Sequence, residues 1–460
     1  MKYLSPVEWA SYQGGFIGLW TDASHAYALY EPGELVAVAL QEGAYPALPY
    51  PAADWFQRLA KDLNGHVATG FHATRTAFEQ FRASDGRAAW PEFMGPGGEG
   101  IDQVAVGPVY GEVTAPVHFR FFTLGERIFE IQTRQGYAHR GILGLMRGQT
   151  PLVACRYAAR VCGDATIAYA IAFARAVEAA LGVNVPVRAH FLRGVMAEIE
   201  RLSNHCGDLG EISALAGNVP LADRCALLRE DLANAAQGVF GHRLMMDAVS
   251  PGGVVKDITE EGIGWLSDVL ENIESEMSDL RRAFLGSASL RARMIGLGVV
   301  SPDLASVYHA GGYVGRAAGQ SRDARLVPGY QPYTELNMMP EVALGGDVAD
   351  RVAVRLAEMT RSISQIQDFL ASLPDGPVAV TLKTGEESEH VTMGLGVAEA
   401  CRGAVWCWLK IEAGHIQNIF VADTSVVYWP LLEQAATSSN LIDFPLIERS
   451  INPSSPASDG

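Results

Sequence analysis

Three ionisable side chains lie within about two turns of one predicted helix. Glu198, Glu200 and His205 all fall in V-P-V-R-A-H-F-L-R-G-V-M-A-E-I-E-R-L-S-N-H. Carboxylates and imidazoles at this spacing can pass protons to one another. An ordinary solvated or capped helix face would carry the same residues, and the spacing favours neither interpretation.

The cysteines limit the metal chemistry that the chain can perform. There are six in 460 residues, which is too sparse for a disulfide framework, and none forms a C-x-x-C pair. Soft metals require thiolate ligands, and no H-E-x-x-H, G-x-S-x-G or phosphate-loop motif is present either. Cys401 and Cys407 flank a short tryptophan-containing apolar segment and are expected to pack rather than to ligate. The six are Cys155, Cys162, Cys206, Cys225, Cys401 and Cys407.

Composition indicates a globular protein without affinity for polyanions. The chain is 48% hydrophobic and 19% charged, with a net charge of −17, which disfavours nucleic acid and anionic membrane surfaces as partners. The most apolar stretch, residues 165–185, is interrupted by Arg175 and Glu178, so no membrane span is expected. The sequence M-K-Y-L-S-P-V-E-W at the amino terminus lacks the apolar core of a signal peptide. Any membrane attachment is therefore expected to run through partner subunits.

The first part of the chain is predicted to form a small α/β region over residues 1–88. F-I-G-L-W, A-Y-A-L-Y and L-V-A-V-A-L have the composition of strands between turns. W-F-Q-R-L-A-K-D-L, before Asn64-Gly65, has helical periodicity. The Gly- and Pro-rich segment E-F-M-G-P-G-G-E-G that follows is typical of a linker.

Residues 89–460 are predicted to form a second domain built on long helices. Short connections join the helices, which indicates a bundle. Strand-rich segments begin near Val104 and Pro377, so the predicted class is α+β: a central long-helix bundle with small flanking β-sheets, plus the N-terminal α/β region. The predicted helices cover residues 151–181, 186–209, 221–240, 259–284 and 347–373.

Several motifs, in order, resemble one known family. They are G-P-V-Y…P-V-H-F-R, G-Y-A-H-R-G-I, R-V-C-G, E-I-E-R-L-S-N-H, S-P-G-G-V, G-Q-S-R-D-A-R and A-E-A-C-R-G. Over roughly residues 104–457 the chain resembles the large subunit of nickel–iron hydrogenases of the formate hydrogenlyase type, and the homologous quinone-site subunit of respiratory complex I. Residues 1–85 resemble a shortened form of the small α/β subunit that is fused ahead of this region in formate hydrogenlyase.

The resemblance implies that the nickel–iron centre has been lost. The family carries two C-x-x-C pairs at positions that fall here on Cys162, Ala165, Ser454 and Ala457. Neither alanine nor a serine hydroxyl replaces a thiolate, so no metal is expected. Taken without the family, Cys162 would be read as a small buried hydrophobe.

The resemblance also suggests roles at a possible acceptor site. His118 matches the histidine that contacts the quinone headgroup in complex I, where a neutral imidazole can donate a hydrogen bond to a quinone carbonyl. However, complex I has a tyrosine where Gly163 stands. Arg402 matches the arginine that packs over the iron's diatomic ligands in hydrogenases. Asp323 and Arg325 could fix the wall of that cavity, although a purely structural buried pair is favoured for them.

A loop with His139 and Arg140 matches the family's loop that faces the nearest iron–sulfur cluster of the partner subunit. A cation there would stabilise a reduced cluster; a solvated surface loop is the alternative. Arg160, one turn from Arg156 and Asp164, could belong to an exposed ion pair on a helix face.

Three functions are compatible with these observations. The favoured one is the large subunit of a membrane-associated oxidoreductase complex related to complex I and to hydrogenases. This chain would bind no cofactor itself, except for a quinone, and electrons would come from a partner's iron–sulfur cluster. The alternative is a non-catalytic structural or coupling subunit, and an active hydrogenase is least favoured. The expected partners are an iron–sulfur small subunit and antiporter-like membrane-arm subunits, with peripheral attachment at the cytoplasmic face of the inner membrane.

Overall fold

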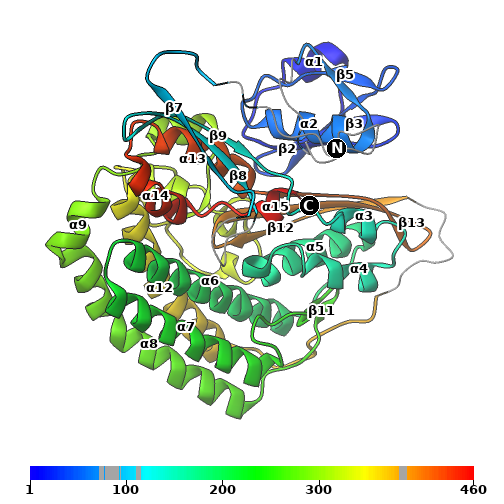
Figure 1. Ribbon diagram of the computed structural model, residues 1–460. Coiled ribbons are helices and arrows are strands. Elements are labelled where there is room, and N and C mark those ends of the chain that lie inside the picture. Colours follow the sequence, from blue (N-terminus) through cyan, green and yellow to red (C-terminus); the bar gives the residue numbers. More distant parts are fainter. Residues whose placement is uncertain (72–76, 78–92, 94, 110–115, 383–390, 460) are drawn as a thin grey trace.

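Four long helices form the core of the molecule and pack side by side (Figure 1). They are α6 (Val187–Leu215), α7 (Val219–Phe240), α8 (Glu260–Gly286) and α12 (Val348–Ala371). This arrangement confirms the predicted bundle. The computed structural model describes residues 1–71, 77, 93, 95–109, 116–382 and 391–459.

A three-stranded antiparallel sheet lies against helix α5 (Thr166–Leu181). Its strands are β12 (Thr392–Ala400), β13 (Gly403–Glu412) and β14 (His415–Asp423). The helix can approach β12 closely because that strand carries glycines. A Cβ atom at Gly394 would stand only 1.8 Å from the carbonyl oxygen of Ala176.

The N-terminal region forms a sheet and a helix, as predicted. Strands β2 (Phe16–Thr21), β3 (His25–Tyr30) and β4 (Glu34–Ala39) form a sheet with β1 (Lys2–Tyr3) in the order β1-β4-β3-β2, and helix α2 (Ala53–Asn64) packs on β2. The smaller elements of this region are α1 (Pro6–Ala10), β5 (Ala44–Pro46) and β6 (Val67–Thr69).

This region contacts the core through stacked aromatic rings. The centroid of Trp20, on β2, lies 4.2 Å from that of Phe420, on β14, with the rings nearly parallel. Such contacts add stability beyond the area that they bury. The domain boundary predicted between residues 88 and 89 falls outside the described residues.

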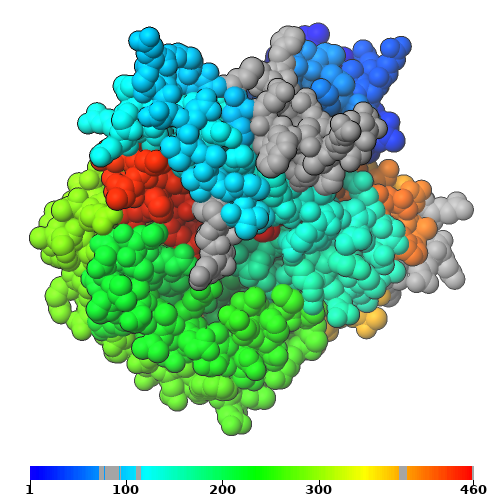
Figure 2. All heavy atoms as spheres, viewed as in Figure 1, coloured from blue at the N-terminus to red at the C-terminus, as the bar shows by residue number. Residues whose placement is uncertain are grey.

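A second three-stranded sheet covers the C-terminal helices. It consists of β7 (Ile101–Val106), β8 (His118–Leu124) and β9 (Arg127–Arg134). Phe119 and Phe121 pack their rings against Phe444, with centroids 5.1 and 4.7 Å away. Figure 2 shows the C-terminal residues, in red, held between this cyan layer and the green bundle.

The prediction of one helix over residues 151–181 is wrong. The chain forms α4 (Pro151–Ala158), then a 3₁₀ turn at Gly163–Ala165, then α5. Cys162 is extended at this break, with φ −138° and ψ 123°. Gly163 and Asp164 have low helical propensity, and the Cys162 side chain has a partner distant in sequence, described below.

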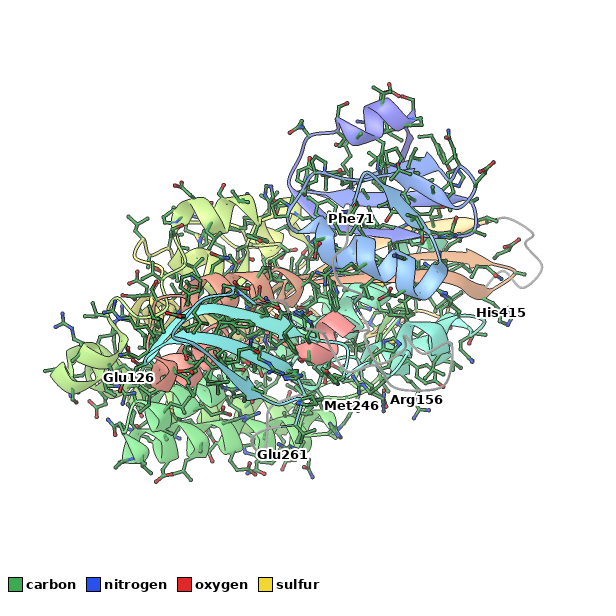
Figure 3. The ribbon with its side chains drawn as sticks, turned by 45° about the horizontal axis from the view of Figure 1, so that its top comes forward. Phe71, Glu126, Arg156, Met246, Glu261 and His415 are labelled. Atoms are coloured by element: carbon green, nitrogen blue, oxygen red, sulfur yellow. The ribbon has the colours of Figure 1, made fainter. Side chains whose placement is uncertain are left out.

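The ion pair predicted for Arg160 on a helix face is also wrong. Its guanidinium binds Asp247, at 2.6 and 2.8 Å, rather than Asp164. Asp247 lies 3.8 Å from Arg156 as well, and Figure 3 places Arg156 and Met246 next to each other at the edge of the core. The pair therefore fastens the break in the helix to the loop after α7.

The remaining elements are short and connect these layers. Within the described ranges, every helix is too short or too polar to cross a bilayer. The short elements are α3 (Ile142–Met146), β10 (Val249–Ser250), β11 (Gly253–Val254), α9 (Ala288–Met294), α10 (Pro302–Val307), α11 (Gly312–Ala317), α13 (Ser425–Ala436), α14 (Phe444–Ile451) and α15 (Ser455–Asp459).

Candidate functional site

The break between α4 and α5 meets the C-terminal segment at Cys162. The Cys162 Sγ atom lies 3.3 Å from the Ser454 Oγ atom, although the two residues are 292 positions apart. The Asp164 carboxylate accepts a second contact from the thiol at 3.4 Å. Burial, helped by the negative charge of Asp164, raises the pKa of the Cys162 thiol well above its usual range. The thiol is therefore neutral at physiological pH in the metal-free protein.

The other two predicted positions adjoin this contact. The Ala165 amide donates to the Cys162 carbonyl at 3.2 Å, and the Ala457 amide donates to Ser454 Oγ at 3.4 Å. All four residues are buried. The structure thus brings together the four positions that the resemblance identified, with one thiol, one hydroxyl and two methyl groups as side chains.

An ion pair closes the site on a second side. Arg402, in the turn between β12 and β13, donates one guanidinium nitrogen to Asp164 and its Nε to the Asn452 carbonyl, the latter at 2.6 Å. Burial is the largest single influence and would raise the pKa of Asp164, but the Arg402 charge, together with hydrogen bonds from Arg402 and Cys162, lowers the pKa to about 2. Arg402 therefore connects the turn after β12 to both segments that meet at Cys162.

His118 lies elsewhere, on β8. Its ring packs edge-on against Phe93, with centroids 4.7 Å apart, and Arg134 is its partner across the strand pair. Burial lowers the pKa of His118, and Arg120 and Arg134 lower it further, so the imidazole is neutral at physiological pH. The Nε2 atom is buried and has no hydrogen-bond partner. Among the described residues, no recorded contact joins His118 to Cys162 or Arg402.

The loop with His139 and Arg140 lies on the other side of the break. An Arg140 guanidinium nitrogen donates to the Val161 carbonyl at 2.5 Å, directly before Cys162 in the sequence. His139 is half-buried and lines an apolar groove that also includes Val161 and Ala457. The structure therefore connects this loop to the Cys162 site through one backbone contact.

Asp323 belongs to a buried ionic network rather than to the Cys162 site. The Arg325 guanidinium binds Asp323 twice, at 2.7 and 2.9 Å, and binds Glu198 of α6 at 3.1 Å. Glu198 also accepts from Tyr333 and Ser362, each at 2.6 Å. Every polar atom of the Glu198 carboxylate thus has a partner, as a buried charge requires.

The same network continues to His205. The Glu358 carboxylate accepts from His205 Nε2 at 2.8 Å and from Arg316 Nε at 2.7 Å, and Arg316 also binds Glu399 at 3.0 Å. Glu200 has different partners, since it accepts from the backbone amides at the start of α5. Glu198, Glu200 and His205, which the sequence grouped as a possible proton relay, therefore do not form one line of contacts.

Sequence reasoning missed two polar residues near the site. Asp164 falls in the R-V-C-G-D segment but was assigned only to a surface ion pair, and its position two residues after Cys162 was the available signal. The other is Asp423, at the end of β14, which accepts from the Tyr169 hydroxyl at 2.9 Å. No local pattern connects those two positions.

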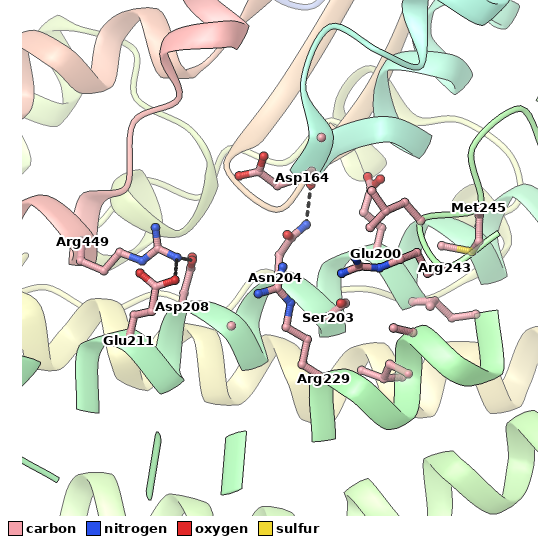
Figure 4. A pocket seen from close by; sticks show the side chains of 16 residues that line it. Asp164, Glu200, Ser203, Asn204, Asp208, Glu211, Arg229, Arg243, Met245 and Arg449 are labelled. Carbon is pink, nitrogen blue, oxygen red and sulfur yellow. Dashed lines mark hydrogen bonds and ion pairs between the residues drawn. The ribbon is translucent and has the colours of Figure 1, made fainter. Parts of the chain in front are cut away.

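A cavity of about 300 Å³ opens beside the site (Figure 4). Gly163 and Asp164 form its inner wall, and residues of α6, α7, the loop after α7 and Arg449 of α14 form the remainder. Asn204, on α6, donates to the Asp164 carbonyl at 2.5 Å. The turn that carries Cys162 is therefore reachable from solvent on this side.

Two families match this chain. Residues 218–400 match "Respiratory-chain NADH dehydrogenase, 49 Kd subunit", and residues 140–216 match "Nickel-dependent hydrogenase". A subunit of the NADH-quinone oxidoreductase of Herpetosiphon aurantiacus is 31% identical over 278 residues, which cover 59% of this chain and 74% of that protein. The chain belongs to the hydrogenase and complex I large-subunit family. This confirms the resemblance found from the motifs.

Two further proteins match over more of the chain. Formate hydrogenlyase subunit 5 of Escherichia coli (strain K12) is 27% identical over 444 residues, which cover 91% of this chain and 77% of that protein. A chain of the membrane-bound sulfane sulfur reductase, an archaeal respiratory membrane complex, aligns with a TM-score of 0.74 at 22% identity and covers 79% of this chain and 100% of its own length. This structural likeness confirms the predicted α+β class.

Proposed function

We propose that this protein is the large subunit of a membrane-associated oxidoreductase complex related to complex I and to hydrogenases, and that it lacks a nickel–iron centre. The observation that carries the second part is the donor set at Cys162, Ala165, Ser454 and Ala457. Nickel and iron in such a site require soft sulfur ligands. One buried thiol, one hydroxyl and two methyl groups do not fit that requirement, so no step here is routed through such a centre.

In this proposal, electrons arrive from an iron–sulfur cluster in a partner subunit. Arg140 is exposed and donates to the carbonyl next to Cys162, so a partner bound at this loop would lie close to the site. A cationic loop favours the reduced, more negative state of a cluster. These features support His139 and Arg140 as the surface that faces the partner's cluster.

The proposed acceptor is a quinone, bound near His118. The Nε2 atom of His118 is buried without a partner, and an unmatched buried polar atom is costly. A quinone carbonyl would satisfy it. Because burial lowers the pKa of His118, the ring would be neutral and would act as a hydrogen-bond donor.

We further propose that residues 1–88 and 89–460 are separate folding units, and that the assembly includes an iron–sulfur small subunit and antiporter-like membrane-arm subunits. The chain would be held peripherally through these subunits, at the cytoplasmic face of the inner membrane. Names of its relatives support a hetero-oligomeric assembly, since one is a hydrogenlyase subunit and another belongs to a respiratory membrane complex.

A second candidate function is a non-catalytic coupling subunit. The contacts at the positions of the lost metal ligands favour it. The Cys162 thiol and the Ser454 hydroxyl form a hydrogen bond, and Arg402 binds Asp164 and the Asn452 carbonyl. These contacts satisfy one another without a ligand. In that case Arg402 and Asp323 would hold segments of the fold in place.

The experiment uses the complex purified with its partners, with nickel measured by mass spectrometry and quinone reduction measured for wild type, His118→Ala and His415→Ala. His415 is the matched control because it lies at the far tip of the β13–β14 hairpin (Figure 3). We expect no nickel, and loss of quinone reduction only in His118→Ala. Unchanged turnover in that variant would leave the coupling role, and about one nickel per chain would overturn the proposed loss of the metal.

A further inference from the structure

The cavity beside Asp164 has two arginines at its mouth. Arg229 comes from α7 and Arg243 from the loop that follows, and Figure 4 shows both reaching toward Ser203 and Asn204 of α6. At about 300 Å³ the cavity falls at the lower end of the range for small-molecule sites. Its mouth therefore presents positive charge beside a hydroxyl and an amide.

Most of the carboxylates in the cavity wall are already neutralised by other arginines. Asp164 pairs with Arg402. Arg449 lies 3.4 Å from Asp208 and 2.7 Å from Glu211. Asp164 and Asp208 are thus held by other arginines, while Glu211 is bound to Arg449 and interacts with Arg229 only at longer range.

Glu200, the fourth acid of the wall, is also satisfied. Its carboxyl accepts from the Ile167 and Ala168 amides at 2.6 and 3.1 Å. Burial raises its pKa to about 8, so it is largely uncharged at neutral pH. It adds no counter-charge for the mouth.

Arg229 and Arg243 lack such close ion pairs among the described residues, although the Arg229 charge acts on the Glu211 carboxyl from a greater distance and partly offsets the rise that burial causes in its pKa. Among the residues that line the cavity, no ion pair involves either guanidinium (Figure 4). Two cations that converge without an anion between them repel each other. An anion between them would remove this repulsion, and a planar guanidinium binds carboxylate or phosphate oxygens in a two-pronged geometry.

Both arginines are positioned by the backbone. A Cβ atom at Gly207 would come within 3.0 Å of an Arg229 guanidinium nitrogen, so the glycine lets that group lie against α6. In the loop of Arg243, Met245 is buried and adopts φ 51°, in the left-handed region that non-glycine residues rarely occupy. Residues in this region cluster at functional sites.

We propose that this cavity binds a small oxyanion, either a carboxylate or a phosphate-type group, between Arg229 and Arg243, with the Ser203 hydroxyl as a further donor. The site goes beyond the function proposed above and involves no redox step. Its occupant would lie against Gly163–Asp164, the turn that carries Cys162. An anion bound there would contact the turn that carries Cys162, at the centre of the subunit.

The test is calorimetric titration of the full-length chain with inorganic phosphate and, separately, with succinate, at constant ionic strength. We expect saturable binding of at least one probe with a Kd of about 1 mM or tighter. Arg229→Gln and Arg243→Gln should each weaken binding about tenfold or more, because each removes a charge-assisted contact. Both side chains are exposed, so circular dichroism should show intact folding.

Arg282→Gln is the control, since it removes the same charge from an exposed arginine on α8 that pairs with Asp279. Binding of phosphate alone would indicate a phosphate-type ligand, and binding of succinate alone would indicate a carboxylate. Absence of saturable binding for both probes would overturn the proposal. Equal weakening in Arg282→Gln, or full affinity in both mouth variants, would also overturn it.

Discussion

Replacing Glu358 with glutamine should destabilise the protein strongly, although it keeps the shape of the side chain. Glu358 lies on α12 and is almost fully buried. It accepts from Arg316 at 2.7 Å and from His205 at 2.8 Å. Because glutamine carries no charge, the substitution would leave the Arg316 cation with less compensation in the protein interior.

The size of the effect follows from what remains around Arg316. Breaking a buried ion pair by removing one partner costs about 3–5 kcal/mol. Arg316 retains Glu399 at 3.0 Å and Asp323 at 3.4 Å, and Glu399 can ionise further when Glu358 is neutral. We therefore expect the lower end of this range, about 3 kcal/mol of unfolding free energy.

Urea unfolding followed by tryptophan fluorescence would measure this loss, with Asp279→Asn as the control. Asp279 pairs with Arg282 at 2.7 Å on the exposed face of α8, and exposed pairs contribute about 0–1 kcal/mol. A Glu358→Gln protein as stable as Asp279→Asn would refute the view that this network carries strong buried electrostatics.

Three further predictions concern single residues. Burial raises the pKa of Glu399 to about 7, so the folded protein holds this proton more tightly than the unfolded chain does. Wild type should therefore lose unfolding free energy relative to Glu399→Gln as the pH rises from about 4.5 to 7. Urea unfolding of both proteins across that pH range would measure the difference. Gly394→Ala should destabilise the protein by several kcal/mol, because the new Cβ atom would clash with the Ala176 carbonyl. Gly144→Ala is the control: it has open space around it and should change stability by no more than about 1 kcal/mol. Similar melting temperatures for the two variants would contradict the packing described for β12. Cys162 should resist a thiol-labelling reagent until the protein unfolds, because burial raises its pKa, and rapid labelling mapped to Cys162 in the folded protein would disprove this.

The sequence predicted the long helices well because their apolar periodicity is regular. The bundle helix expected at residues 259–284 is observed as Glu260–Gly286. The break at Cys162 has a local signal in Gly163 and Asp164, which have low helical propensity, but the contact with Ser454 comes from 292 residues away and could not be read from the local sequence.

In the ionic network, too, contacts between near neighbours in the sequence were predicted and long-range contacts were not. The motif R-D-A-R led us to expect that Asp323 and Arg325 form a buried structural pair, and the pair forms. Its third member, Glu198, lies 127 residues away and could be grouped only with its helical neighbours. Family motifs placed Cys162 and Ser454 near each other, but they did not indicate that Asp164 would bridge Cys162 and Arg402.

The hydrogen bond between the Cys162 thiol and the Ser454 hydroxyl has a consequence for biosynthesis. A ribosome makes position 162 long before position 454, so the pocket around the cysteine stays incomplete while the intervening helices emerge and pack. Its apolar and charged walls stay exposed to solvent and to other nascent chains until residue 454 has been made. A partner subunit that binds at this surface would consequently do so only after residue 454 has left the ribosome.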